Sequence, residues 1–224
     1  MSHKILAFAA LLALLCQASV ARPKQADTVR LTVSAFNDAE VPPSVLLTAR
    51  ARAEAVFAEA GIELTWLDCG TPGHWTVSRG CTLVAYPVHL SLRLTKDGAH
   101  RTKDTFGESF LDQRGWGNYA SVYMTALDSS PALGVLSEGE LLGYVAAHEL
   151  GHLLLGKDSH SQEGVMRPVW QFEDLQQAAR GKLCFTPSQV RRMRAAYLSA
   201  SQNTRFGSSS APLSVVLLSP PSGR

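Results

Sequence analysis

The most restrictive feature of the sequence is a nearly uninterrupted apolar stretch that carries two histidines and a glutamate. The stretch covers residues 143–155, and its polar members are Tyr144, His148, Glu149 and His152. Helix geometry places residues four apart on one face, so His148 and His152 can share a metal ion. Burying these groups without partners would be costly in free energy. The alternative interpretation is a pair of core histidines that hydrogen bonds satisfy.

The helix that would carry this stretch has a recognisable start and stop. Ser137 and Glu140 have the spacing of a capping box, in which each side chain bonds to the backbone of the other residue. The pattern predicts a helix that runs to about Leu155. Gly156 is expected to end it in a left-handed turn.

A catalytic zinc site needs a third protein ligand and a position that is open to water. His160 follows the predicted turn at Gly156, and the few residues between them can return it toward the metal. Asp158 is the competing ligand. We prefer His160, because neutral imidazole suits zinc and this histidine has no other explanation. The remaining histidines are interpreted as surface or strand residues: His74, His89 and His100.

The N-terminal segment has the features of a secretory signal peptide. Lys4 precedes an apolar stretch over residues 5–15, and small residues lead up to Ala21. The stretch is too short to cross a bilayer, which takes about 20 residues. We expect residues 1–21 to be removed, so that the mature protein is secreted or periplasmic and has no membrane attachment.

Export changes the interpretation of the cysteines. Cys16 would leave with the signal peptide. Cys69 and Cys81 bracket a loop that contains Gly and Pro, and in an oxidising compartment they are the expected disulfide. Cys184 remains and is expected to be a buried free thiol.

Composition narrows the classes of partner. Hydrophobic residues make up 46% of the 224 residues and charged residues 18%, which is typical of a globular chain. The formal net charge is +2, without a block of Lys and Arg, so neither nucleic acid nor an anionic membrane is expected as a partner. We expect residues 22–200 to form a monomeric domain and residues 201–224, rich in Ser and Pro, to be a flexible tail.

The order of predicted elements indicates a mixed, mostly parallel sheet. Strand 29–36, a helix that opens at Pro42-Pro43 and ends at Gly61, and strand 62–67 would form a βαβ unit. The other predicted elements are strands 83–94 and 119–127, a short edge strand at 106–111 and a helix that starts at Pro187.

Residues 148–168 read HELGHLLLGKDSHSQEGVMRP and resemble the metzincin clan of zinc peptidases, most closely its matrixin branch. The resemblance implies an α+β (α/β-like) fold, in which a twisted, mostly parallel mixed sheet carries an active-site helix, a backing helix and a small C-terminal helical part. It implies one catalytic Zn²⁺ ion and a peptide or protein substrate. The site residues that it implies are the ligands His148, His152 and His160, the general base Glu149 and the Met-turn residue Met166.

The sequence departs from the family motif after the second histidine. Seven residues separate His152 from His160, where the usual motif has five. Strict spacing would place Asp158 at the third ligand position, and the motif glycine is displaced by one residue to Gly156. The extra length can be absorbed in the turn, but it leaves the choice between His160 and Asp158 open.

Three functional hypotheses follow. The first is a secreted zinc endopeptidase, the second is a zinc hydrolase that acts on another amide such as a cell-wall peptide, and the third is a binding module without turnover. The presence of Glu149 argues against the third hypothesis, because a purely structural zinc site would more often have a fourth protein ligand. By analogy with the family, an extended peptide could add to the edge strand near residues 105–111.

Overall fold

The computed structural model describes residues 29–70, 79–83, 86–97, 105–113 and 115–206. The predicted signal peptide, His74, His100 and the chain after residue 206 lie outside the described residues. In chain order the elements are β1 (Val29–Asn37), α2 (Pro43–Glu59), β2 (Ile62–Asp68), a 3₁₀-helix (Arg79–Thr82), β3 (His89–Thr95), β4 (Gly107–Phe110), β5 (Tyr119–Tyr123), α3 (Met124–Asp128), a second 3₁₀-helix (Pro131–Gly134), α4 (Glu138–Leu155), α5 (Phe172–Ala179) and α6 (Pro187–Phe206).

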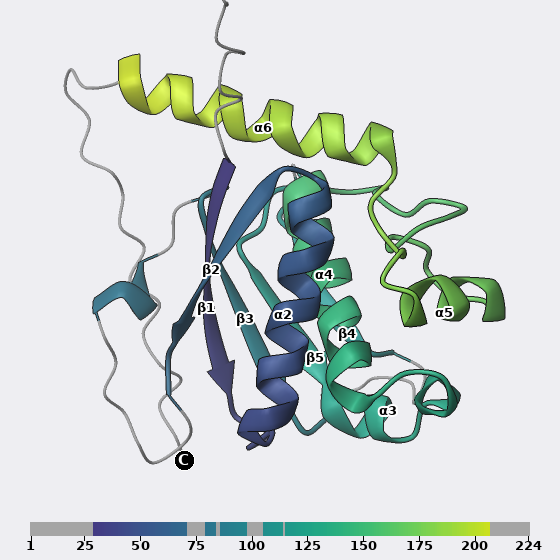
Figure 1. Ribbon diagram of the computed structural model, residues 1–224. Helices are drawn as coiled ribbons and strands as arrows, with labels where there is room; N and C mark the ends of the chain where they lie inside the picture. The colour runs from purple at the N-terminus through teal and green to yellow at the C-terminus, as the bar shows by residue number, and fades with distance from the viewer. Residues whose placement is uncertain (1–28, 71–78, 84–85, 98–104, 114, 207–224) are drawn as a thin grey trace, which may run out of the picture.

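The strands form one mixed sheet in the order β2-β1-β3-β5-β4. The first four strands in this order pair in parallel, and β4 pairs antiparallel with β5 at the edge. Figure 1 shows α2 and α4 side by side over one face of the sheet, with α6 across the end at which β1 and β2 begin. The expected mixed, mostly parallel sheet with an edge strand is confirmed.

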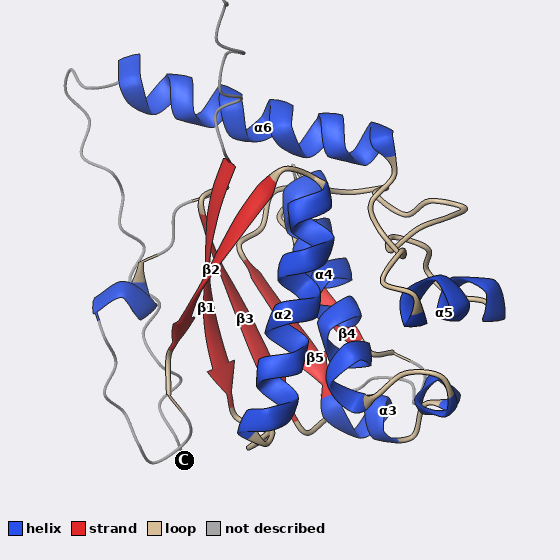
Figure 2. Cartoon of the chain, viewed as in Figure 1, coloured by secondary structure: helices blue, strands red, loops and turns tan. Residues whose placement is uncertain are grey.

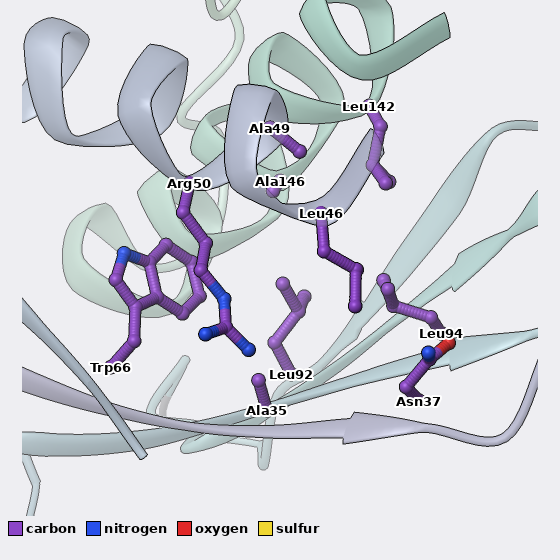
Figure 3. Close-up of a pocket in the computed structure, with 10 residues that line it drawn as sticks. All are labelled: Ala35, Asn37, Leu46, Ala49, Arg50, Trp66, Leu92, Leu94, Leu142 and Ala146. Atoms are coloured by element: carbon purple, nitrogen blue, oxygen red, sulfur yellow. The ribbon is translucent and has the colours of Figure 1, made fainter. Parts of the chain in front are cut away.

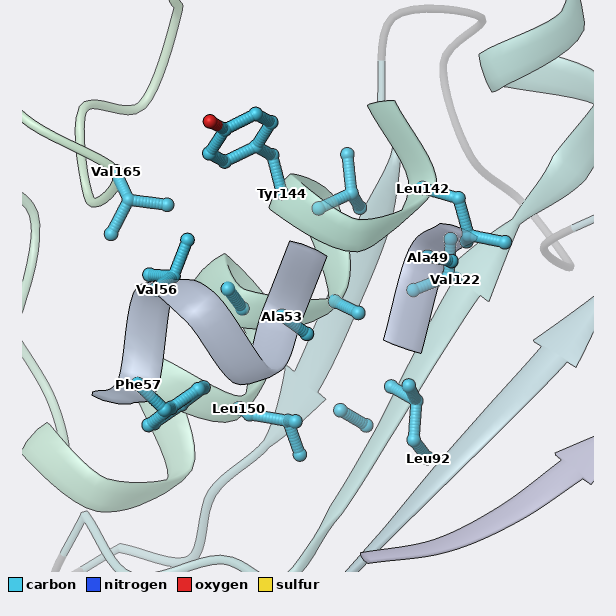
Figure 4. Close-up of a cluster of buried hydrophobic side chains, with 14 of the residues drawn as sticks. Ala49, Ala53, Val56, Phe57, Leu92, Val122, Leu142, Tyr144, Leu150 and Val165 are labelled. Carbon is cyan, nitrogen blue, oxygen red and sulfur yellow. The ribbon is translucent and has the colours of Figure 1, made fainter. Parts of the chain in front are cut away.

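The alternating burial of side chains along β1 shows which face of the sheet the helices cover. Val29, Leu31 and Val33 alternate along the strand and are buried, as expected for the side of a strand that faces a core. Phe57 of α2 and Leu150 of α4 fill the space between the helices and the sheet (Figure 4). The core therefore lies on the face of the sheet that α4 crosses.

Two glycines let α4 approach α2 closely. A Cβ atom at Gly139 would lie 2.7 Å from Cβ of Thr48, and one at Gly143 would lie 2.6 Å from the carbonyl oxygen of Ala49. Residues four apart lie on one helix face, so the two positions form a flat strip against α2. Figure 2 shows α2 and α4 side by side in front of the sheet.

Both ends of α4 have identifiable caps. Ser137 and Glu140 form the predicted capping box. At the other end Gly156 has φ 77° and ψ −159°, so its φ is positive as expected, but the backbone is in an extended region that only glycine adopts easily. Arg192 of α6 donates to the carbonyl oxygen of Leu155 at 2.8 Å, which satisfies one of the last carbonyls of the helix.

Two predicted strands are too long. The pattern at 83–94 predicts a strand throughout, but β3 begins at His89; Pro87 has no N–H group to donate to a ladder. The pattern at 119–127 also fails in its second half, because β5 ends at Tyr123 and α3 follows. The pairing with β3 ends at Tyr123 opposite Thr95, and the pairing with β4 reaches only Val122 opposite Gly107.

The C-terminal part is more helical than predicted. The sequence pattern did not indicate α5, and α6 continues to Phe206, into the segment expected to be a flexible tail. Residues 201–206 contain neither Gly nor Pro, so nothing in the sequence ends the helix there. Among the described residues, none of the helices combines the length and hydrophobicity needed to span a membrane.

The cysteines are arranged as the sequence suggests. Cys69 and Cys81 form a disulfide, with Cα atoms 5.5 Å apart. Cys69 follows the end of β2, and Cys81 lies in the first 3₁₀-helix, so the bond ties this short helix to the sheet. Cys184 is a free thiol, half-buried rather than fully buried.

We expect Gly143→Ala to destabilise the fold, although alanine favours helix by about 1 kcal/mol over glycine. The added methyl group would lie 2.6 Å from the carbonyl oxygen of Ala49 and 2.6 Å from Cβ of Arg52. Overpacking of this kind lowers the free energy of unfolding by about 1–3 kcal/mol. Gly134→Ala is the matched control, because a Cβ atom there would meet nothing within 4 Å. Urea unfolding of both variants measures the difference, and equal stabilities would contradict the close approach of α2 and α4.

Candidate metal centre

Three histidine side chains converge at the end of α4. His148 and His152 come from the helix, and His160 comes from the loop that follows it. One ring nitrogen from each lies within 4.8 Å of the other two, and Nε2 of His148 is 3.0 Å from Nε2 of His152. Nitrogens that share a tetrahedral zinc ion are about 3.3 Å apart. The arrangement is therefore the right size to hold one metal ion.

Hydrogen bonds to the other ring nitrogens orient both helical histidines. Nδ1 of His148 donates to the carbonyl oxygen of Val165 at 2.7 Å, which leaves the Nε2 lone pair of the neutral ring facing the group. Nδ1 of His152 lies 2.6 Å from Oγ of Ser159, a buried hydroxyl that can accept its proton. Partners of this kind fix the tautomer and orientation of metal-binding histidines.

The loop that carries His160 is fastened to α6. The side-chain amide of Gln189 donates to the carbonyl oxygen of Ser159 at 3.1 Å and to Oγ of Ser161 at 3.0 Å. Gln189 is only 3% exposed, so these bonds are shielded from water. His160 therefore sits between two residues that the same side chain holds in place.

Met166 packs directly beneath the helix that carries the histidines. It is fully buried, and a Cβ atom at Gly151 would lie 2.6 Å from its sulfur. Only glycine at this position of α4 leaves room for the sulfur. The carbonyl oxygen of the preceding residue, Val165, accepts the hydrogen bond from His148, and Nε1 of Trp170 donates to the same oxygen at 3.1 Å. The turn at Met166 thus packs against α4 and orients the ring of His148.

Glu149 follows His148 directly in α4 and is 6% exposed. Its Oε2 accepts a hydrogen bond of 2.7 Å from Oγ of Ser109, on edge strand β4. Burial raises the pKa of Glu149 to about 7, and the nearby Glu108 adds to this effect, while the bond from Ser109 works against it. The carboxyl can therefore exist with or without its proton near neutral pH.

Burial keeps the helical histidines neutral. It lowers the pKa of His148 to about 4, although the bond to Val165 opposes this. It lowers the pKa of His152 to about 3, assisted by the neighbouring rings of His148 and His160. Burial also lowers the pKa of His160. Neutral imidazoles bind metal without first having to lose a proton.

Asp158, the competing ligand, does not belong to the three-histidine group. It is exposed and has φ 54°, so it serves as a turning point in the loop. His89 is also elsewhere, in β3, where its Nε2 lies 2.8 Å from Oγ of Ser34. The sequence did not single out Ser109, Ser159 or Gln189 as site residues; the one available signal was the spacing of Thr186 and Gln189 at the start of α6.

A separate cavity lies between α2 and the sheet (Figure 3). Its lining includes Leu46, Arg50, Trp66, Leu92 and Ala146, and it contains none of the histidine group. Its volume is about 30 Å³, and a buried water needs roughly 10–15 Å³ measured in this way. The cavity can hold a water or two, but it is too small for a substrate.

Comparisons with known proteins identify distant structural likenesses. No protein-family model matches the chain, and no curated protein matches it in sequence. The chain is similar to the crystal structure of archaemetzincin from Methanopyrus kandleri, with 19% identity and a TM-score of 0.48 over 76% of this chain and 96% of that one. It is also similar to a zinc-dependent peptidase from Methanocorpusculum labreanum, with 14% identity and a TM-score of 0.47 over 72% and 99%. Neither likeness is close enough to assign an activity, so the function is inferred from the geometry of the site.

We expect His160→Ala to lose most of its bound zinc, because two imidazoles alone do not complete a catalytic zinc site. Asp158→Asn should keep about one zinc per chain, because Asp158 lies outside the group and asparagine tolerates its positive φ. Metal analysis after dialysis against a weak chelator measures both. Retention of zinc by the first variant and loss by the second would reverse the choice of ligand.

In protein stripped of metal, stability should fall as the pH is lowered from about 6.5 to about 4. The pKa values of His148 and His152 are about 4 and about 3 in the fold and 6.5 ordinarily, so the unfolded chain binds more protons in this window. Glu149 opposes them between pH 4.5 and about 7, because its pKa is higher in the fold. Two histidines outweigh one glutamate, so stability still rises with pH.

Urea unfolding at a series of pH values tests this balance. Glu149→Gln removes the opposing group, so stability should rise more steeply with pH between 4.5 and 6.5. An unchanged slope in the variant would show that Glu149 does not take up a proton on folding.

Proposed function

We propose that this protein is a secreted zinc-dependent metallopeptidase of the metzincin type. The observation that carries the proposal is the convergence of His148, His152 and His160 on one point, at the end of a helix that also carries the buried Glu149. Two imidazoles on one helical face, a third from the following loop and an adjacent carboxyl are the groups that metal-assisted hydrolysis requires.

The donor set fits zinc. The facing Nε2 atoms of His148 and His152 are close together, and they belong to partly buried rings that desolvation keeps neutral. Imidazole nitrogens suit zinc, and three protein ligands leave a fourth position open, as in catalytic rather than structural sites. Within the described residues, Asp158 is not placed to supply that fourth ligand.

When bound, zinc would supply a Lewis acid that polarises the scissile carbonyl and lowers the pKa of water toward about 7. Glu149 would accept the proton of the attacking water and later pass it to the leaving amine. A general base is most effective when its pKa is near the working pH, and in the metal-free protein burial raises the pKa of Glu149 to about 7. His148 and His152 stay in place during this transfer, because Val165 and Ser159 hold their other nitrogens.

Secretion is supported by two features of the sequence and the fold. The N-terminal segment has the pattern of a signal peptide. The disulfide between Cys69 and Cys81 suits an oxidising compartment. We therefore propose that the enzyme acts outside the cytoplasm on peptide or protein substrates.

Glu149→Gln should keep about one zinc per chain and lose at least about 100-fold in hydrolysis, because the amide cannot accept the proton of water. Glu138→Gln is a matched control at the start of the same helix, away from the three histidines, and should retain activity. Metal analysis and peptide hydrolysis of the three proteins provide the measurements. Full activity of Glu149→Gln would rule out the role assigned to Glu149.

The substrate class requires a separate comparison. Casein and purified cell wall should be incubated side by side with the zinc-loaded wild-type protein. Release of peptides from casein supports the peptidase. Release from cell wall alone would indicate a hydrolase of cell-wall amides, and zinc binding without either activity would indicate a binding module.

A further inference from the structure

Ser109 on β4 makes contacts that the proposed reaction does not use. Its Oγ lies 2.7 Å from Oε2 of Glu149 and 2.8 Å from the backbone carbonyl oxygen of the same residue. We propose that Ser109 is a positioning residue that holds the Glu149 carboxyl in the orientation needed for proton transfer. This inference rests on the role proposed above for Glu149, and it adds a second residue to the same machinery.

The sheet fixes where Ser109 lies. Strand β4 pairs antiparallel with β5, with Ser109 opposite Ala120 and Gly107 opposite Val122. Alternate residues of a strand face the same side, so positions 107 and 109 both face α4. A Cβ atom at Gly107 would lie 2.7 Å from Cγ of Glu149 and 2.8 Å from its Oε1. The carboxyl of Glu149 thus lies against Gly107, which has no side chain, and accepts a hydrogen bond from the hydroxyl of Ser109.

The hydroxyl suits both forms of a general base. It has one proton to donate and lone pairs to accept another. When Glu149 is ionised, Ser109 donates to Oε2. When Oε2 carries a proton, Oγ of Ser109 can accept a hydrogen bond from it. The hydroxyl then donates its own hydrogen bond to the backbone carbonyl oxygen of Glu149, 2.8 Å away. Alanine could do neither, so the carboxyl would lose its fixed orientation in both halves of the cycle.

Burial makes this partner important. Glu149 is 6% exposed, so water is not freely available to replace a lost hydrogen bond. A hydrogen bond to a charged group contributes roughly 1.5–3 kcal/mol, which corresponds to about a 10- to 100-fold change in rate if it is lost in the transition state. Small displacements of a catalytic group have effects of this size.

The test compares Ser109→Thr with Ser109→Val, because the two side chains have the same shape and only threonine has a hydroxyl. We expect valine to lower kcat about 10- to 100-fold with KM and zinc content unchanged, since Glu149 is not a ligand. Threonine should restore most of kcat. Ser121→Ala on the neighbouring strand β5 is the control: Ser121 is buried, but its Oγ bonds to the hydroxyl of Tyr119, so activity should not change.

Equal losses with threonine and valine, or wild-type kcat with valine, would overturn the proposal. An active wild-type enzyme that tolerates valine contradicts only the role of Ser109. A zinc-loaded wild-type chain that hydrolyses nothing contradicts the proposed function instead.

A second measurement does not depend on activity. In metal-free protein, thermal unfolding of Ser109→Ala, Glu149→Ala and the double variant forms a double-mutant cycle. Residues in direct contact should give non-additive shifts of the midpoint. Additive shifts would show that the two side chains are not coupled, and they would overturn the proposal even if no substrate is found.

Discussion

The whole arrangement depends on burying polar groups in a helix that is apolar on nearly every side. Helix α4 crosses the core, yet it carries two imidazoles and a carboxyl. Each of these groups has a specific partner: Val165 for His148, Ser159 for His152 and Ser109 for Glu149. Without these partners the burial would oppose folding. The partners come from the edge strand β4 and from the segment between α4 and α5, so both must be packed against α4 before the site can exist.

These segments reach the polar groups of α4 because they pack closely against the helix. Three close contacts of α4 or of the Glu149 carboxyl have a glycine: Gly143 against α2, Gly151 against Met166, and Gly107 against Glu149. A methyl group at any of these positions would fall within 2.8 Å of a neighbouring atom. The helix can therefore lie tightly against α2, the Met166 turn and β4 together. The same tight packing excludes water from the carboxyl, which raises the pKa of Glu149.

The sequence predicted those features that depend on local chemistry. The capping box at Ser137, the start of α6 at Pro187 and the helical spacing of His148 and His152 can all be found by reading along the chain. Ser109 could not be found in this way, because its partner lies 40 residues away and its importance arises only when β4 pairs at the edge. The strand ends were predicted wrongly for a similar reason. Strand β5 ends where its pairing with β3 ends, and the residues of β5 alone do not indicate this point.

The longer loop before the third histidine has a structural explanation. Gly156 and Asp158 both have positive φ, so the chain turns twice within three residues of the end of α4. The first turn leads the chain away from the helix, and the second brings Ser159 back to within 2.6 Å of His152. His160 then follows directly into the group. The two residues in excess of the usual motif spacing are thus accommodated in the turn, and Asp158, at the strict motif position, becomes the turning point instead of a ligand.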